Sequence, residues 1–185
     1  MVVRDKGSLL NAENCRVKGA EPCPHCTLHA LALPSGVLVY MGARLELSRT
    51  CIDNVGRGVT VCQSSAAVLT DCNVERVAEV PSQGMEGCGI LSFDSNVELS
   101  RCVFYRSNES SRGVFGVYAR NSSVKLQGCR VLRSKVGVML YRSQGVLADC
   151  DFASSGEMGV FAGEHSSLDM QGCMCSGTAD CGVQV

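Results

Sequence analysis

Pairs of a glycine followed by Val or Ile recur at seven regularly spaced positions along the chain, and this repeat constrains the fold more than any other feature. Successive pairs are separated by 21 to 31 residues. An internal period of this length is typical of solenoids, in which each repeat forms one turn and stacks on its neighbours. The pairs begin at Gly36, Gly58, Gly89, Gly116, Gly137, Gly159 and Gly182.

A series of cysteines follows the glycine pairs in the same register. Apolar residues lie three positions before and two positions after most of these cysteines, and within each segment they alternate with period two, which is typical of strands. A repeat of about 22 residues has room for two or three short strands and none for a helix. The ladder cysteines are Cys15, Cys51 (slipped by one position), Cys72, Cys102, Cys129, Cys150 and Cys173.

This arithmetic predicts an all-β right-handed parallel β-helix of about seven rungs, with an inward ladder of Cys and Val. With neighbouring strands about 4.8 Å apart, seven rungs make a rod of about 34 Å. We expect the ladder thiols to pack inside the rod as small apolar groups. Stacked side chains point in parallel and do not face each other as a disulfide requires.

The repeat unit resembles that of the pectin-lyase-like β-helix family, whose loose consensus is Gly-Ile-x-φ followed by φ-x-x-Asn-x-φ, where φ is apolar. Cysteine largely replaces the Asn here, as in residues 69–74 (Leu-Thr-Asp-Cys-Asn-Val) and 147–152 (Leu-Ala-Asp-Cys-Asp-Phe). Such rungs are similar to those of eukaryotic cytosolic members, the F-box β-helix and Shc-binding scaffold proteins. The resemblance implies a fold, and a fold alone does not determine a function.

The length of 185 residues, 45% apolar content and net charge of −1 indicate one folded domain over residues 1–185. Residues 18–35 form an expected loop insertion, and residues 77–86 and 107–112 form longer turns. Neither end carries a capping segment, so we expect either a fragment of a longer protein or a chain that pairs end to end. Bare strand edges favour self-association through the terminal rungs.

The thirteen cysteines are an odd number, the N-terminus is charged where a signal peptide would be apolar, and no window is apolar enough for a membrane span. These features predict reduced thiols, a cytoplasmic location and no membrane partner. Cys23 and Cys26, with His29 nearby, form either half of a zinc site or a plain loop with reducible thiols. Because no second pair completes four ligands, we predict no metal and no cofactor.

Catalysis is the less favoured interpretation. Resemblance to pectate lyases implies clustered Asp ligands for calcium with a basic residue, and resemblance to polygalacturonases implies three Asp and a Gly-His-Gly. The sequence contains neither set, and it has no Trp to form a glycan platform. We therefore predict no catalytic residue. A carbohydrate-binding or carbohydrate-cleaving module remains the alternative.

The outward side of the Gly-Val strands is a candidate binding surface. If Val points inward, the next residue on each strand points outward, and this row is mostly apolar. An exposed apolar row of this kind marks a protein interface. The alternative is that the insertion at 18–35, or polypeptide absent from this chain, covers it. The row comprises Leu38, Thr60, Leu91, Tyr118, Met139, Phe161 and Gln184.

Basic residues are concentrated in residues 101–142, which hold nine Lys and Arg against one acid. Arg76, Arg106 and Arg133 each follow a ladder cysteine by four positions, and with Arg120 and Arg142 they form a candidate basic belt. Such a belt would attract an acidic or phosphorylated protein, and nucleic acid is disfavoured because no aromatic residues are interleaved for base stacking. The alternative is a solvated turn without a partner.

Together these features predict a non-catalytic interaction scaffold, in which a rigid rod presents an apolar strand face beside the basic belt to a protein partner. The candidate partner-binding residues are Leu38, Leu91, Tyr118, Met139, Phe161, Arg76, Arg106, Arg120, Arg133 and Arg142.

Overall fold

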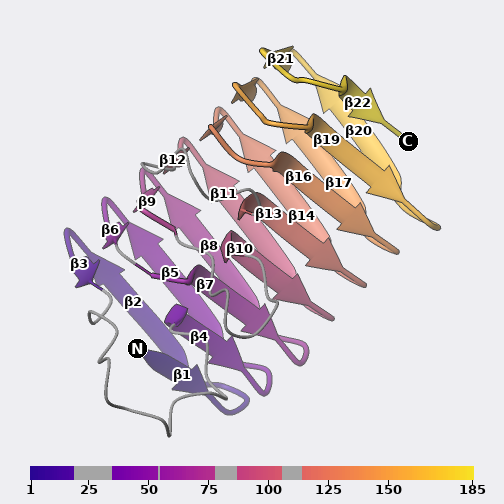
Figure 1. Cartoon of the computed structure of the whole chain (residues 1–185). Helices are drawn as coiled ribbons and strands as arrows, with labels where there is room; N and C mark the ends of the chain where they lie inside the picture. Colours follow the sequence, from indigo (N-terminus) through magenta and orange to yellow (C-terminus); the bar gives the residue numbers. More distant parts are fainter. Residues whose placement is uncertain (19–34, 54, 78–86, 106–113) are drawn as a thin grey trace, which may run out of the picture.

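The computed structural model shows a rod of stacked rungs whose three sides are parallel β-sheets (Figure 1). It describes residues 1–18, 35–53, 55–77, 87–105 and 114–185. The described residues form strands and turns and contain no helix. Each of seven rungs contributes one strand to each sheet in the same order, and β22 adds an eighth strand to the first sheet, so the predicted all-β right-handed parallel β-helix is confirmed.

Three sheets run along the rod, and we call them A, B and C. Sheet A consists of β1 (Val2–Arg4), β4 (Ser35–Tyr40), β7 (Arg57–Cys62), β10 (Gly87–Phe93), β13 (Val114–Arg120), β16 (Val136–Tyr141), β19 (Met158–Gly163) and β22 (Cys181–Gln184). Sheet B consists of β2 (Leu9–Glu13), β5 (Arg44–Ser48), β8 (Ala66–Thr70), β11 (Asn96–Ser100), β14 (Ser123–Gln127), β17 (Gln144–Ala148) and β20 (Ser167–Gln171). Sheet C consists of β3 (Arg16–Lys18), β6 (Cys51–Asp53), β9 (Asn73–Glu75), β12 (Val103–Tyr105), β15 (Arg130–Leu132), β18 (Asp151–Ala153) and β21 (Met174–Ser176).

Most of the residues at which a rung turns have a positive φ angle. At the corner between sheets B and C, one such residue directly precedes each ladder residue, with φ between 46° and 64°. Asn, Asp and Gly tolerate this conformation best and fill five of the seven positions, which keeps the corner tight at little strain. The seven are Asn14, Arg49, Asp71, Arg101, Gly128, Asp149 and Gly172.

The interior confirms the predicted inward register. The Val or Ile that follows each glycine is completely buried in six consecutive rungs, at Val37, Val59, Ile90, Val117, Val138 and Val160. The glycine itself is required by close packing. A Cβ atom on Gly116 would clash with the side chain of Val131 and the carbonyl oxygen of Gly137 on the next rung.

Two details of the prediction are corrected. Thr50, 1% exposed, occupies the ladder position of the second rung, while Cys51 begins β6 and pairs with Asn73 on its outer side. The hydroxyl of Thr50 donates to the Ser48 carbonyl at 2.9 Å, as ladder thiols do on other rungs. Lys18 ends β3 and Ser35 begins β4, so these two ends of the expected insertion are strand residues.

Several predicted features fall on parts of the chain that the structure does not describe. The interior of the 18–35 insertion, with Cys23, Cys26 and His29, lies outside the described residues, as do the longer turns apart from Val77. The described cysteines are all free thiols. Within the described ranges, no helix is long and apolar enough to cross a membrane.

Candidate functional site

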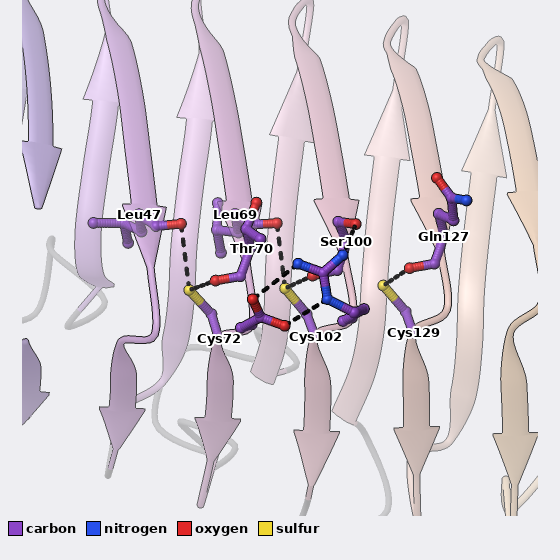
Figure 2. A network of polar contacts seen from close by, with 10 residues as sticks. Leu47, Leu69, Thr70, Cys72, Ser100, Cys102, Gln127 and Cys129 are labelled. Carbon is purple, nitrogen blue, oxygen red and sulfur yellow. Dashed lines mark hydrogen bonds and ion pairs between the residues drawn. The ribbon is translucent and has the colours of Figure 1, made fainter. Parts of the chain in front are cut away.

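Four ladder thiols form a buried column at the corner between sheets B and C. Cys72, Cys102 and Cys129 of this column are drawn in Figure 2. Each of the four thiols donates to the carbonyl two residues earlier, and Cys102 also contacts the Leu69 carbonyl of the preceding rung at 3.4 Å. Contact with neighbouring thiols of the column, together with burial, raises the pKa of Cys102. The column comprises Cys72, Cys102, Cys129 and Cys150, and its contacts give it a structural role.

A second ladder, of serines, lies at the corner between sheets A and B. Four of the hydroxyls accept a hydrogen bond from the backbone N–H of the equivalent serine on the preceding rung, and Ser65 accepts one from the N–H of Gly42, all at 3.1 to 3.3 Å. The serines stand seven residues before a ladder cysteine, and this spacing is the sequence signal that would have identified them. They are Ser65, Ser95, Ser122, Ser143 and Ser166.

The predicted outward row does form a continuous line across the outer face of sheet A. Leu91 pairs in register with Tyr118, Tyr118 with Met139, and Met139 with Phe161. Leu38 joins the row further along, through Thr60. Tyr118, Met139, Phe161 and Leu38 are partly exposed.

Leu91 departs from the expected exposure, because only 6% of its surface is accessible. It packs in a separate apolar cluster on this outer face with Cys88, Phe115 and Val136, which are also buried. Leu91 therefore contributes to the base of the surface, and the partly exposed neighbours Tyr118, Met139 and Phe161 form its accessible part.

Aromatic rings on this face contact one another across four rungs. The ring centroids of Phe93 and Tyr118 are 6.0 Å apart, those of Tyr118 and Tyr141 are 6.0 Å apart, and those of Tyr141 and Phe161 are 5.6 Å apart. We call these four residues the aromatic ladder. Sequence reasoning missed Phe93 and Tyr141, although each stands two positions beyond a predicted outward residue and so faces the same side.

The candidate basic belt does not form one surface. Arg76 and Arg133 occupy equivalent corner positions with positive φ, but their side chains have different partners. Arg76 is paired with the buried carboxylate of Asp53, and the guanidinium of Arg133 lies 5.5 Å from the centre of the Tyr105 ring. Arg142 lies 3.5 Å from Glu164 at another corner, and Arg106 lies outside the described residues.

The ion pair of Asp53 links three rungs. Arg76, which follows β9, and Arg16 of β3 both donate to this carboxylate, which lies between them in β6 and has no exposed surface. These hydrogen bonds, those of Arg76 first, lower the pKa of Asp53 to about 2, against an ordinary value of 3.8. Arg76 therefore links neighbouring rungs, and its predicted part in partner binding stays a prediction.

A shallow hollow of about 290 Å³ lies on the outer face of sheet B. Its lining is largely aliphatic, and its charged side chains, Glu98 and Lys125, pair with each other at 3.2 Å. Among the described residues, no group of three or more His, Cys, Asp or Glu side chains could hold a metal ion.

Comparison with known proteins agrees with this architecture. A family model described as a right-handed beta helix region matches residues 35–185, which is most of the chain. Searches of curated proteins and of solved structures found no match. On the strength of the family match and the three stacked parallel sheets, the chain belongs to the right-handed beta helix family.

Proposed function

We propose that the protein is a non-catalytic interaction scaffold that binds a protein partner through the outer face of sheet A. The observation that carries this proposal is the aromatic ladder, whose rings lie on a base of buried apolar side chains and remain partly accessible. Contiguous apolar surface with Tyr and Phe is typical of protein interfaces. Equivalent residues of neighbouring rungs are aligned in register, so the rod holds this surface in one rigid arrangement.

The charged groups support a non-catalytic role. Acid–base catalysis needs a titratable group that is free to exchange a proton with the substrate. In the hollow on sheet B, the carboxylate of Glu98 is already paired with Lys125. On the outer face of sheet A, the side chains of the outward row from Leu38 to Gln184 are uncharged. Among the described residues of these two surfaces, there is no pair of free carboxylates of the kind expected of a glycan-cleaving site.

The rival function is carbohydrate binding, which the wider fold family makes reasonable. Sugar rings stack best on flat, exposed aromatic faces, whereas neighbouring rings of the ladder are tilted by 45° to 59° to each other. This arrangement favours side chains that fit between rings. The Cys-bearing rungs, similar to those of F-box and Shc-binding β-helix proteins, support a cytoplasmic scaffold rather than a secreted carbohydrate module.

Capture from an extract of cells that express the protein tests the proposal, using two matched variants. Met139→Glu places a charge in the proposed interface, and Val146→Glu places the same charge on sheet B, where Val146 is 46% exposed. We expect proteins retained by the wild type to be lost with Met139→Glu and kept with Val146→Glu. Equal retention by both variants would contradict the proposal, and micromolar binding of acidic polysaccharides by the wild type would favour the rival.

A further inference from the structure

The basic stretch between residues 101 and 142 is in part neutralised within the rod. Five of its side chains lie within 4 Å of a carboxylate on a neighbouring rung, so they contribute little net field to an approaching anion. The pairs are Arg101 with Asp71, Lys125 with Glu98, Arg130 with Asp151, Lys135 with Glu157, and Arg142 with Glu164.

Arg120 differs from these cations. It is exposed at the end of β13, on the outer face of sheet A, and among the described residues no carboxylate lies within ion-pair distance of it. Arg120 is aligned with Phe93 on one neighbouring strand and with Tyr141 on the other, so it lies between two residues of the aromatic ladder. An exposed cation within an apolar surface selects for an anion with apolar neighbours.

We propose that the aromatic ladder and Arg120 bind a short, extended segment of the partner protein that carries one Glu or Asp flanked by apolar side chains. This inference rests on the proposed scaffold function and specifies its ligand. The ladder spans β10, β13, β16 and β19, a distance of about 14 Å, which an extended chain covers in about five residues. The acidic side chain lies near one third of that length, opposite Arg120.

The charge distribution favours a carboxylate over a phosphate. A single guanidinium forms a two-pronged pair with one carboxylate, whereas a phosphate dianion is best held by several cations. Arg142, which follows Tyr141 at the same end of sheet A, is already engaged, since it pairs with Glu164. The mutual tilt of the rings favours peptide side chains over the flat face of a sugar.

An array of immobilised nonapeptides tests the proposal. The central five positions vary among Phe, Leu, Tyr and Val, except for one position that is Glu, Gln, Lys or phosphoserine. The proteins applied are the full wild-type chain, Arg120→Glu, and Lys125→Glu as a control with the same charge change on sheet B, where Lys125 is exposed. Affinities of the strongest peptides are then measured in solution by fluorescence anisotropy at low salt.

We expect Glu peptides to bind the wild type at least about tenfold more tightly than their Gln counterparts, which corresponds to about 1.4 kcal/mol. Arg120→Glu should shift the preference to Lys peptides, and Lys125→Glu should leave the preference for Glu unchanged. Circular dichroism of the variants confirms that the fold is kept.

Three results would overturn the inference: equal binding of Glu and Gln peptides, a preference for phosphoserine, or no binding by any peptide. Each leaves the scaffold proposal to be decided by Met139→Glu against Val146→Glu. Binding of polygalacturonate that is lost in Arg120→Glu would instead assign the face to an acidic glycan, and would overturn both proposals.

Discussion

Arg76 donates two hydrogen bonds to the carboxylate of Asp53, although Asp53 has no exposed surface. The guanidinium side of the pair is half exposed, so the charge of Arg76 is anchored at the surface while its partner is inside. With Arg16 on the other side, at 2.9 Å, this arrangement connects the first three strands of sheet C. The pair therefore contributes to stability, and the Arg76 guanidinium already has a carboxylate partner within the rod.

The Asp53 pair predicts an acid-dependent contribution to stability. Because the pKa of Asp53 is about 2 in the folded protein and near 3.8 when unfolded, ionised Asp53 stabilises the fold above about pH 4. That contribution is lost as the pH falls from 4 towards 2. We expect the difference in unfolding free energy between the wild type and Asp53→Asn, measured by urea denaturation, to shrink over this interval. A difference that does not depend on pH would contradict the ion-pair account.

The thiol column predicts strong discrimination between substitutions at Cys129, which is completely buried. Cys129→Asp would bury a carboxylate without a partner and should destabilise the protein by at least about 3 kcal/mol. Cys129→Thr should be mild, because Thr50 already occupies the equivalent position on the second rung and donates to its local carbonyl. Thermal unfolding followed by circular dichroism distinguishes them. An Asp variant that melts within a few degrees of the wild type would show that the thiol does not point inward.

The serine ladder predicts a penalty for losing one hydroxyl. Ser122 accepts from the backbone N–H of Ser95 and donates to the Arg120 carbonyl at 2.8 Å. Ser122→Ala leaves that buried N–H without its acceptor and should destabilise by roughly 1–3 kcal/mol in urea denaturation. Ser123→Ala, at a partly exposed position of β14, serves as the control and should have little effect. Equal destabilisation by the two substitutions would contradict a stabilising role for the serine ladder.

Close packing between rungs predicts that replacing Gly116 destabilises the fold. In Gly116→Ala the new methyl group would meet the backbone oxygen of Gly137, which cannot move without disturbing the next rung. We expect a loss of about 1–3 kcal/mol in unfolding free energy. Gly156→Ala is the control, because its nearest neighbour, the Ser134 carbonyl oxygen, would be 3.8 Å away. Tolerance of Gly116→Ala with an unchanged melting temperature would contradict this packing.

The fold and the inward register were predictable from sequence because a solenoid repeats one local pattern. A Gly-Val or Gly-Ile pair and a ladder position recur together on six consecutive rungs, so alternation alone identifies Val117 or Cys129 as buried. On the second rung, Thr50 and not Cys51 occupies the ladder position. This was missed because a hydroxyl can make the same contact with a carbonyl as a thiol. A search limited to cysteine could not detect that equivalence.

The contacts between rungs were not predictable in the same way. Arg76 and Arg133 have equivalent sequence positions, yet one pairs with Asp53 and the other lies over Tyr105, because their neighbouring strands carry different side chains. The aromatic ladder also depends on ring rotations and on exact register across sheet A. The burial of Leu91 follows from its packing with Cys88 and Phe115, which local alternation does not reveal.

Site-specific photocrosslinking tests the central claim most directly. A benzophenone side chain introduced at position 139, on the outer face of sheet A, is compared with one at position 146, on the outer face of sheet B. Partner capture followed by irradiation should yield a crosslinked polypeptide from position 139 and none from position 146. Crosslinks of equal yield from both positions, or from position 146 alone, would contradict the claim that sheet A presents the interaction surface.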